Sequence, residues 1–491
     1  MSAIGYDYLR QSLGLDAFEP SRPALVKPVT RVETTPTFLA VPAHVAPQSG
    51  QPLDHVLFAL KHEGVNLQVL AQALLHVPAE ALREALNGTP NGQYIRTASY
   101  LWETLTQRTL TDVPAVGGTV VDLFDSDRYI TGPATRNGKW RVNFNGLGTP
   151  GYCATVERTP ALQYCLDSGL LSRARDFMDS LGQGVLDRTL AWAYLHETRD
   201  SFAIEKESPS ESKAQAFVDL LRQAHHRIPL TEDYLAELQS ATVANPVDKA
   251  VGFRHEQNWL EGPGRGAAAV TYLPPPPELA RELMGELMTF ANGVAGNADP
   301  IVVASVVSFG FVFLHPFMDG NGRLSRFLFH HALCQSGALA GGLVLPVSVA
   351  MKKNEADYLR VLQDYSQPAR RRWRVDWVDA ARYDFHFTGH PSMYRYWDAT
   401  HQVEFGFRMA EQALEVELRQ ETRFLEHYDT ISKAVNERFD VRGSDLSTLI
   451  VSTLDNRGIV SRRRRDQFGQ RMPAEVFALV EALATKVLSE E

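Results

Sequence analysis

Residues 301–326 read IVVASVVSFGFVFLHPFMDGNGRLSR, and this stretch decides how we expect the chain to fold. Residues 301–314 are apolar on nearly every side, which predicts a buried central helix. Pro316 cannot continue that helix, and the residue before a proline avoids the helical region. We therefore expect the helix to stop at His315, with the imidazole at its end.

The Gly-Asn-Gly sequence at 320–322 predicts a tight turn, because glycine tolerates positive φ and close backbone approach. A second helix should follow and end at Gly337. A glycine-rich turn that leads into a helix presents free N–H groups and a positive dipole end, which suits phosphate. Arg323 and Arg326 lie three positions apart, so they share one face. Two cations at a helix N-terminus are unfavourable unless an anion lies between them.

Two further residues complete a chemical site. Asp319 supplies a hard oxygen ligand of the kind that Mg²⁺ accepts beside phosphates. His315 can accept a proton near neutral pH. Taken alone, a buried histidine is usually a core residue, and Arg323 alone would be a surface cation. The combination of a base, a carboxylate, an anion cradle and two arginines favours catalysis. The P-loop pattern GxxxxGK[ST] is not in the sequence.

The stretch 315–326, HPFMDGNGRLSR, resembles the core motif of the Fic family, HxFx(D/E)GNGRxxR, at every fixed position. This resemblance implies an ATP-using enzyme in which His315 deprotonates a Ser, Thr or Tyr hydroxyl of a target protein. The hydroxyl would attack the α-phosphate of ATP, and Asp319 would hold Mg²⁺. Phe317 would anchor the loop in the core. The resemblance assigns phosphate contacts to the N–H groups of Gly320, Asn321 and Gly322, to the Asn321 side chain, to Arg323 and, for the γ-phosphate, to Arg326.

Upstream, residues 199–209 read RDSFAIEKESP and resemble the inhibitory motif of Fic proteins, (S/T)xxxE(G/N), through Ser201 and Glu205. Lys206 departs from this pattern, because the family has a small residue there. The resemblance implies that Glu205 pairs with Arg326 and occupies the place of the γ-phosphate. The alternative is an ordinary helix start that Asp200 or Ser201 caps.

Residues 252–272 contain two strand-like stretches on either side of the turn EGPGRG. They resemble the flap beside the Fic site, where a segment of the target protein would add as an extra strand. A simple surface hairpin is the alternative. Tyr358 lies four positions after Asn354 on an expected helix. By resemblance it flanks the adenine, although aromatic residues at this spacing are commonly core.

The rest of the chain divides by pattern. Residues 1–52 are rich in proline and predict an extended lead-in, whereas 53–150 predict a small α+β module with a hairpin at Asn137-Gly138. Residues 159–367 should form the Fic-type helical core. Residues 370–491 should be mostly helical, with the basic clusters 370–374 and 462–465.

The second of these clusters leaves open whether the C-terminal region binds DNA. Residues 431–458 resemble a helix-turn-helix, and GIVSRRRRDQF could supply a strand and a wing. Charge runs are usually solvated faces, and a substrate-recognition or dimer-forming module is equally compatible. The net charge of -9 argues against general attraction to nucleic acid.

The composition predicts an ordinary soluble globular protein, the helical periodicity predicts a mainly α fold, and we expect the protein in the cytoplasm. Its 44% hydrophobic and 22% charged residues are typical of soluble globular chains. Three cysteines without CxxC spacing predict neither a zinc site nor a disulfide framework. We expect no signal peptide and no membrane span. The oligomeric state stays open.

Three functions compete. The leading hypothesis is a protein adenylyltransferase, which uses ATP and Mg²⁺ and is inhibited by Glu205; it could also modify itself. A rival keeps the site but removes AMP or transfers another phosphate-containing group. Gly322, where phosphorylating relatives have lysine, argues against phosphorylation. The third hypothesis is a DNA-binding or interaction protein with a silent Fic core, and the intact pair His315 and Asp319 speaks against it.

Overall fold

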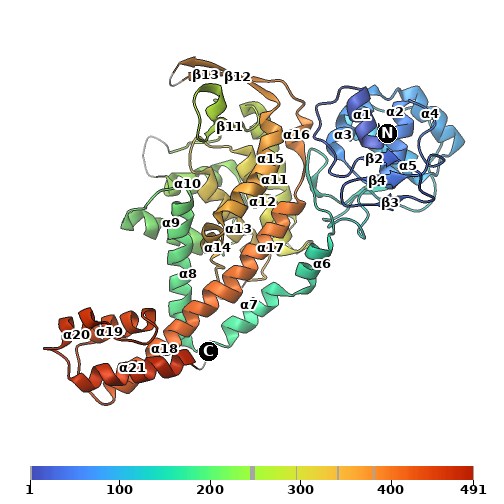
Figure 1. Ribbon diagram of the computed structural model, residues 1–491. Coiled ribbons are helices and arrows are strands. Elements are labelled where there is room, and N and C mark those ends of the chain that lie inside the picture. The colour runs from blue at the N-terminus through green and yellow to red at the C-terminus, as the bar shows by residue number, and fades with distance from the viewer. Residues whose placement is uncertain (1–2, 244–248, 295, 340–341, 380–381, 490–491) are drawn as a thin grey trace. The chain divides into compact units, whose positions relative to one another are not determined.

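The computed structural model describes residues 3–243, 249–294, 296–339, 342–379 and 382–489, and its fold is mainly α, as predicted (Figure 1). Contacts divide the chain into two compact units, which are described separately. The first unit holds Met1–Gly169, Phe202–Ala338 and Asn354–Arg408. The second holds Leu170–Ser201, Leu339–Lys353 and Met409–Glu491. The domain boundaries expected from the sequence stay predictions.

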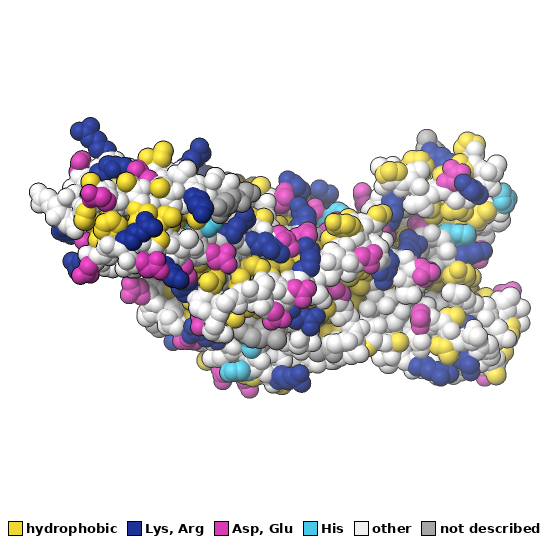
Figure 2. All heavy atoms as spheres, turned by 90° about the horizontal axis from the view of Figure 1, so that it is seen from below, with side chains coloured by type: hydrophobic (Ala, Val, Ile, Leu, Met, Phe, Trp, Pro, Cys, Tyr) yellow, Lys and Arg dark blue, Asp and Glu magenta, His cyan; other side chains and the backbone are white. Residues whose placement is uncertain are grey.

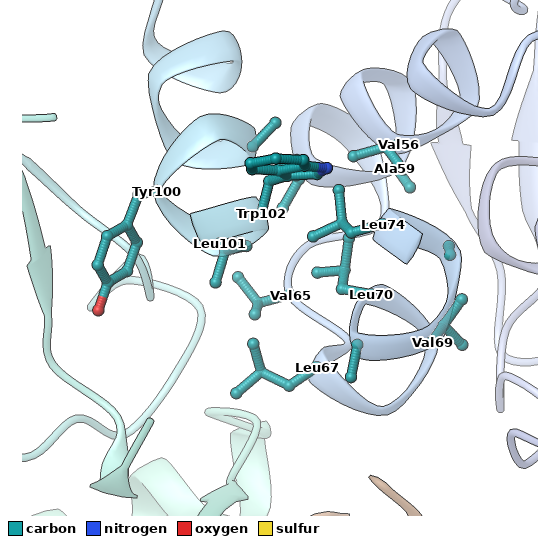
Figure 3. Close-up of a cluster of buried hydrophobic side chains, with 14 of the residues drawn as sticks. Val56, Ala59, Val65, Leu67, Val69, Leu70, Leu74, Tyr100, Leu101 and Trp102 are labelled. Carbon is teal, nitrogen blue, oxygen red and sulfur yellow. The ribbon is translucent and has the colours of Figure 1, made fainter. Parts of the chain in front are cut away.

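The N-terminal part of the first unit is a group of helices around an apolar core. Its helices are α1 (Gly5–Ser12), α2 (Pro52–His62), α3 (Leu67–Ala73), η1 (Leu74–His76), α4 (Ala79–Gly88) and α5 (Gln93–Thr106). Figure 3 shows how side chains of α2, α3, η1 and α5 meet, among them Val56, Ala59, Leu70, Leu74, Leu101 and Trp102. Full burial of one such large side chain stabilises the fold by about 1.5–3 kcal/mol.

Residues 1–52 are not the extended lead-in that their proline content predicted. Besides α1 they form a four-stranded sheet in the order β1-β2-β4-β3. In chain order these strands are β1 (Ala3–Ile4), β2 (Ala24–Val26), β3 (Glu33–Thr34) and β4 (Leu39–Val41). Tyr6 and Leu9 of α1 are buried, and the Tyr6 hydroxyl donates a hydrogen bond of 2.6 Å to the carbonyl of Gly64. The prolines limit the lengths of short strands, and the apolar residues between them still join the core.

Two three-stranded sheets follow. β5 (Val121–Asp122), β7 (Val142–Phe144) and β6 (Thr135–Asn137) form one, in that order. The predicted hairpin is confirmed: Asn137 pairs with Val142, and Arg141 in the connecting turn has a φ of 53°. The other sheet has the order β14-β9-β8, from β14 (Tyr396–Asp398), β9 (Tyr152–Thr155) and β8 (Leu147–Thr149). It joins segments more than 200 residues apart.

The remaining helices of the first unit include α12, which packs against α11 and α13. They are α6 (Pro160–Asp167), α9 (Glu211–Gln223), α10 (Glu232–Thr242), α11 (Pro277–Gly293), α12 (Pro300–Leu314), α13 (Asn321–Gln335), α15 (Glu355–Arg370), α16 (Ser392–Arg395) and the first part of α17 (Thr400–Gln412). Every residue of 301–314 is buried, which confirms the predicted central helix. The Asp299 carboxylate accepts hydrogen bonds from the N–H groups of Ile301 and Val302 and so caps the start of α12. Gly337 ends the second helix segment with a φ of 74°.

Two hairpins lie together beside this core (Figure 1). β10 (Leu260–Glu261) and β11 (Val270–Tyr272) form the predicted antiparallel pair, shorter than expected, with η3 (Gly266–Ala269) before β11. The second hairpin, β12 (Trp373–Asp379) and β13 (Arg382–Phe387), was not predicted, whereas the chain after it is mostly helical, as expected. The Trp259 ring centroid lies 5.6 Å from that of Tyr383 and 5.1 Å from that of Phe385.

The second unit is helical. Its elements are α7 (Leu170–Asp179), most of α8 (Gln183–Ile204), α14 (Val347–Lys353), η4 (Ala413–Leu418), α18 (Arg419–Asn436), α19 (Gly443–Asp455), α20 (Arg462–Phe468) and α21 (Ala474–Ser489). The last four helices share a core that includes Ile431, Leu449 and Phe468.

The expected winged arrangement is wrong, because the described residues from 399 to 489 contain no strand. The four arginines 462–465 begin α20 instead, with the Ser461 side chain as its N-cap. Arg465 forms a 2.6 Å ion pair with Glu481 of α21, which helps to hold this short helix against its neighbour. A helix therefore replaces the predicted strand and wing.

The surface carries mixed charges. On the face seen in Figure 2, Lys and Arg side chains are interspersed with Asp and Glu side chains, so that face has no single-sign field. Within the described ranges we find no helix that is both long and apolar enough to span a bilayer.

Candidate active site

His315 ends the central helix in an unusual backbone conformation. It is the C-cap of α12 with φ 49° and ψ 57°, in the left-handed region that costs a non-glycine residue about 1–2 kcal/mol. Its N–H donates to the carbonyl of Phe311 at 2.9 Å. Its own carbonyl accepts hydrogen bonds from Arg254 Nε at 3.0 Å and Asn258 Nδ2 at 3.3 Å. The surrounding structure thus holds His315 in a conformation that the residue alone disfavours.

The imidazole of His315 is set up to accept a proton. Its Nδ1 lies 3.0 Å from the carbonyl oxygen of Val312. Because a carbonyl only accepts, Nδ1 carries the hydrogen, and Nε2 of the neutral ring keeps its lone pair. The side chain is buried, and this burial lowers the pKa of His315 to about 4. The ring is therefore neutral at pH 7.

The loop after His315 is held by its own asparagine. The Asn321 Oδ1 accepts from the N–H of Phe317 at 3.0 Å, and its Nδ2 donates to the carbonyl of Phe317 at 2.7 Å. The side chain of Asn321 is thus engaged with the loop, not directed at a phosphate as the resemblance implied. Phe317 is fully buried, which confirms its predicted role as an anchor. Gly320 has a φ of 85°, and Asn321 opens α13.

Asp319 lies at the open side of this loop. Its side chain is 47% exposed, and Oδ1 accepts a 2.7 Å hydrogen bond from the N–H of Gly320. Arg323 Nη2 lies 3.3 Å from both carboxylate oxygens. No group of three or more His, Cys, Asp or Glu residues that could hold a metal occurs in the part of the chain that the structure describes. Mg²⁺ would therefore have one carboxylate here and need phosphate oxygens and water as its other ligands.

Both motif arginines are buried and paired with glutamates of the upstream segment. Each side chain is 1% exposed. Arg323 Nη1 lies 2.7 Å from Glu207 and also donates to the carbonyl of Thr242 at 3.2 Å. Arg326 Nη2 lies 2.9 Å from Glu205. Two desolvated cations at the start of α13 thus face two carboxylates, as expected for a site that binds anions.

The upstream segment is the end of a helix. α8 stops at Ile204, and Lys206 takes a φ of 61°, the left-handed conformation that glycine or asparagine adopts most readily. The N–H of Lys206 donates to Ala203, and the N–H of Glu207 donates to Phe202. The alternative that Ser201 caps a helix start is therefore wrong, because Ser201 is a buried residue near the C-terminus of α8.

Glu205 lies directly over the start of α13. A Cβ added to Gly322 would lie 2.0 Å from Glu205 Oε1, so a larger residue at 322 would collide with this carboxylate. Glycine at this position therefore permits the close approach of Glu205 to the helix N-terminus. The predicted pair of Glu205 and Arg326 is present, and the structure adds the pair of Glu207 and Arg323, which the sequence patterns did not indicate.

Tyr358 supports Arg326 from the core. Its hydroxyl contacts the side chains of Arg326 and Ser325, and its ring stacks on Phe405 with centroids 5.7 Å apart. Burial raises the pKa of the Tyr358 phenol. The ring is therefore packed as a core residue, and its place beside an adenine stays a prediction.

Sequence reasoning also missed the side chains behind the flap. Arg254 and Asn258 bond to the carbonyl of His315, which lies 61 and 57 positions away. Because their partners are backbone atoms, which every residue carries, no residue pattern could have indicated these contacts. The bonds depend on how the segment before β10 passes over the end of α12.

A cavity of about 590 Å³ lies elsewhere in the first unit, lined by residues that include Tyr6, Glu63, Arg128 and Glu404. None of the motif residues lines it. We assign the site to the His315 loop because its groups form a coherent reaction centre, which cavity size alone does not indicate.

This chain is similar to known proteins over part of its length. Residues 229–333 match the model of the Fic/DOC family. Protein adenylyltransferase fic-1 of Caenorhabditis briggsae is 31% identical over 121 residues, which are 24% of this chain and 22% of that protein, so the chain spans only about a fifth of this relative. Two solved structures are a Fic family protein from Desulfovibrio desulfuricans G20 and Fic-1 from C. elegans. The first is 17% identical with a TM-score of 0.37 and covers 65% of this chain and 87% of that chain. The second is 18% identical with a TM-score of 0.32 and covers 65% and 93%.

Proposed function

We propose, from the premise that this chain contains a domain of the Fic/DOC family, that it transfers AMP from ATP to a hydroxyl of a target protein. One observation carries the proposal. The buried imidazole of His315 lies at the end of α12, is neutral and has its Nε2 lone pair available. The buried cations Arg323 and Arg326 lie in the first turns of α13. This combination serves a reaction that removes a proton and stabilises negative charge on phosphates.

In the proposed step, His315 Nε2 takes the proton of a Ser, Thr or Tyr hydroxyl. The hydroxyl oxygen forms a bond to the α-phosphorus of ATP, and the bond from that phosphorus to the oxygen bridging to the β-phosphate breaks. Pyrophosphate leaves with its electron pair, and the proton on His315 passes to pyrophosphate or water. A positioned base contributes roughly 10²- to 10⁴-fold in rate, and orientation of the reactants contributes more.

The chain's own groups would hold the nucleotide. Asn321, Gly322 and Arg323 are the first residues of α13, and N–H groups at a helix start have no acceptor within the helix. They would face phosphate oxygens, with Arg323 and Arg326 beside them. Asp319 would hold Mg²⁺, which when bound neutralises charge on the phosphates.

We propose that the resting protein is inhibited by Glu205. Its carboxylate is 2.9 Å from Arg326 and lies over Gly322, in the space that a phosphate at the start of α13 would need. A bound γ-phosphate would compete for the same guanidinium. Such competition lowers the affinity for ATP until the glutamate leaves.

The proposed partner is a target protein whose extended segment adds to the flap, β10 and β11. Leu260 is 41% exposed, and β10 is a short strand at the edge of a two-stranded sheet, so its outer backbone groups are available for pairing. The chain itself could be one such target.

Incubation with ATP labelled at the α- or the γ-phosphate tests the proposal. We expect α-label to be retained on protein and γ-label to leave as pyrophosphate, more strongly for Glu205→Gly than for the wild type. Retention of γ-label would mean phosphorylation. With no label retained, release of AMP from a target that had been modified beforehand would mean the reverse reaction. If no label is retained and no AMP is released, the proposal of an active transferase is wrong.

A further inference from the structure

Arg254 is a buried cation without an acidic partner. It is 5% exposed, and within the described ranges no carboxylate lies at ion-pair distance from it, although Glu278 attracts it from further away. Its guanidinium donates to three backbone carbonyls: those of His315 at 3.0 Å, Glu256 at 3.0 Å and Pro275 at 2.5 Å. Burying a cation is costly, so a site that keeps one bonded only to carbonyls needs a reason beyond stability.

Arg254 and Asn258 together bond to the carbonyls of three consecutive residues, 315–317. Arg254 Nε bonds to the carbonyl of His315, and the Arg254 N–H bonds to that of Pro316 at 2.8 Å. Asn258 Nδ2 bonds to the carbonyls of His315 at 3.3 Å and Phe317 at 2.7 Å. Asn321 also bonds to the backbone of Phe317, so three side chains hold this loop.

These hydrogen bonds hold the backbone at His315, which has a disfavoured conformation. His315 has a left-handed backbone, and a rotation of its carbonyl would change the backbone from which the side chain projects. Arg254 also bonds to Pro275, just after β11, and Asn258 lies two residues before β10. The same side chains thus connect both ends of the flap to the residue that would take the proton.

We propose that Arg254 and Asn258 are positioning residues that hold the His315 imidazole in its reactive orientation and couple it to the flap. This inference rests on the proposed function for its effect on rate, but not for its effect on the orientation of His315. An error of about 1 Å in the placement of a catalytic group can cost roughly 100-fold in rate. Binding of ATP depends on α13 and should change little.

The chain offers a matched control. Arg370 also donates to three carbonyls, those of Val270 and Ala267 within the flap and of Trp373 beyond it, at 2.8, 3.2 and 2.9 Å. None of these belongs to the His315 loop. Substituting Arg370 therefore removes an arginine of the same kind without releasing His315.

The test compares Arg254→Lys, Arg254→Met, Asn258→Ala and Arg370→Met, each in a Glu205→Gly background. The first readout is the ¹H–¹³C correlation of the His315 Cε1 position at pH 7.5 without metal, in protein with labelled histidine, assigned by its loss in His315→Gln. We expect Arg254 and Asn258 substitutions to shift this signal and Arg370→Met to leave it in place.

The second readout is kinetic. Arg254→Lys keeps the charge but cannot reach all three carbonyls, so we expect kcat to fall roughly 10- to 100-fold while KM for ATP changes less than about twofold. Arg370→Met should not show this split. Should Arg254→Met lose its cooperative melting transition, Arg254→Lys and Asn258→Ala carry the test.

An unmoved His315 signal, or a kcat equal to that of Arg370→Met, would overturn the inference. If the chain transfers no AMP, the kinetic readout is silent but the His315 signal still decides the positioning role. Failure of the proposed function and failure of this inference are therefore distinguishable.

Discussion

Two regions that face each other differ in burial: the loop 315–320 with the start of α13, and the upstream segment 205–207. Arg323 and Arg326 are 1% exposed, whereas their partners Glu207 and Glu205 are 38% and 36% exposed. The cations are thus fixed in the core, and the anions reach them from the surface. A negative partner stabilises a buried guanidinium group, and glutamate and phosphate can each supply that charge.

The charges and the backbone conformation of the upstream segment are unfavourable at their positions. Glu205 and Glu207 follow the C-terminus of α8, where the helix dipole disfavours acidic residues by about 0.3–1 kcal/mol each. Lys206 between them has a left-handed backbone, which costs a non-glycine residue about 1–2 kcal/mol. The ion pairs offset these costs, so a competing anion needs to displace only a weakly held segment.

Removing the base should have the largest effect. We expect His315→Ala to reduce AMP transfer roughly 10²- to 10⁴-fold while ATP still binds, because the arginines and the α13 start remain. Initial rates and ATP affinity measure this. His331→Ala is the control: His331 is buried on α13 and bonds to the carbonyl of Ile228, so it should lose stability and keep its rate. Equal losses for the two variants would contradict the assignment.

The pH dependence of the rate tests whether burial lowers the pKa of His315. Burial lowers the pKa of His315 to about 4, so the neutral, reactive form persists until the pH falls toward that value. The rate should be level from pH 8 to 5 and decline below. An ordinary histidine of pKa about 6.5 would lose about tenfold by pH 5.5. Initial rates across this range, with folding checked by circular dichroism, separate the two cases.

Releasing Arg326 should raise ATP affinity. A hydrogen bond to a charged group is worth about 1.5–3 kcal/mol, and partial exposure of Glu205 places the effect at the low end. We therefore expect Glu205→Gly to bind ATP about tenfold more tightly, measured by titration calorimetry on the His315→Ala background to prevent turnover. Glu211→Gly, a change at an exposed position of α9, should leave affinity as it was. Identical affinity in both variants would remove the inhibitory contact.

The second pair should have a smaller influence. Arg323 also bonds to Thr242 and approaches Asp319, so it keeps partners when Glu207 is lost. We expect Glu207→Ala to tighten ATP binding about two- to fivefold. The double variant with Glu205→Gly shows whether the pairs act independently, in which case their free-energy changes add. Weaker binding by Glu207→Ala would mean that Glu207 orients Arg323 for ATP.

The smallest effect concerns Lys206. Glycine adopts the left-handed conformation without strain, so Lys206→Gly should raise the free energy of unfolding by up to about 1 kcal/mol. Urea unfolding measures this, with Gln215→Gly at an exposed position inside α9 expected to change stability in the opposite direction. A loss of stability in Lys206→Gly would show that the lysine side chain contributes more than its backbone costs.

Much of the site could be predicted because its signals are local. The apolar run before Pro316 predicts where α12 ends, and glycine at 320 and 322 predicts a close turn. The hairpin of β12 and β13 was missed, although Tyr383, Phe385 and Phe387 alternate as strand residues do. The arginines at 370–374 favour a charged surface in a reading of the sequence. The aromatic face of the hairpin packs against the flap, a contact that only the folded chain makes.

Short-range rules of proline, glycine and hydrophobic periodicity predict the central apolar helix and the turn after it. The roles of the groups from His315 to Arg326 come from the resemblance to the Fic motif and stay predictions. The contact of Glu207 with Arg323 and the hydrogen bond of Arg254 to the carbonyl of His315 depend on the fold of the whole unit. The reason is physical: those partners are charges on distant segments or backbone atoms common to all residues, and only the folded path of the chain brings them within bonding distance.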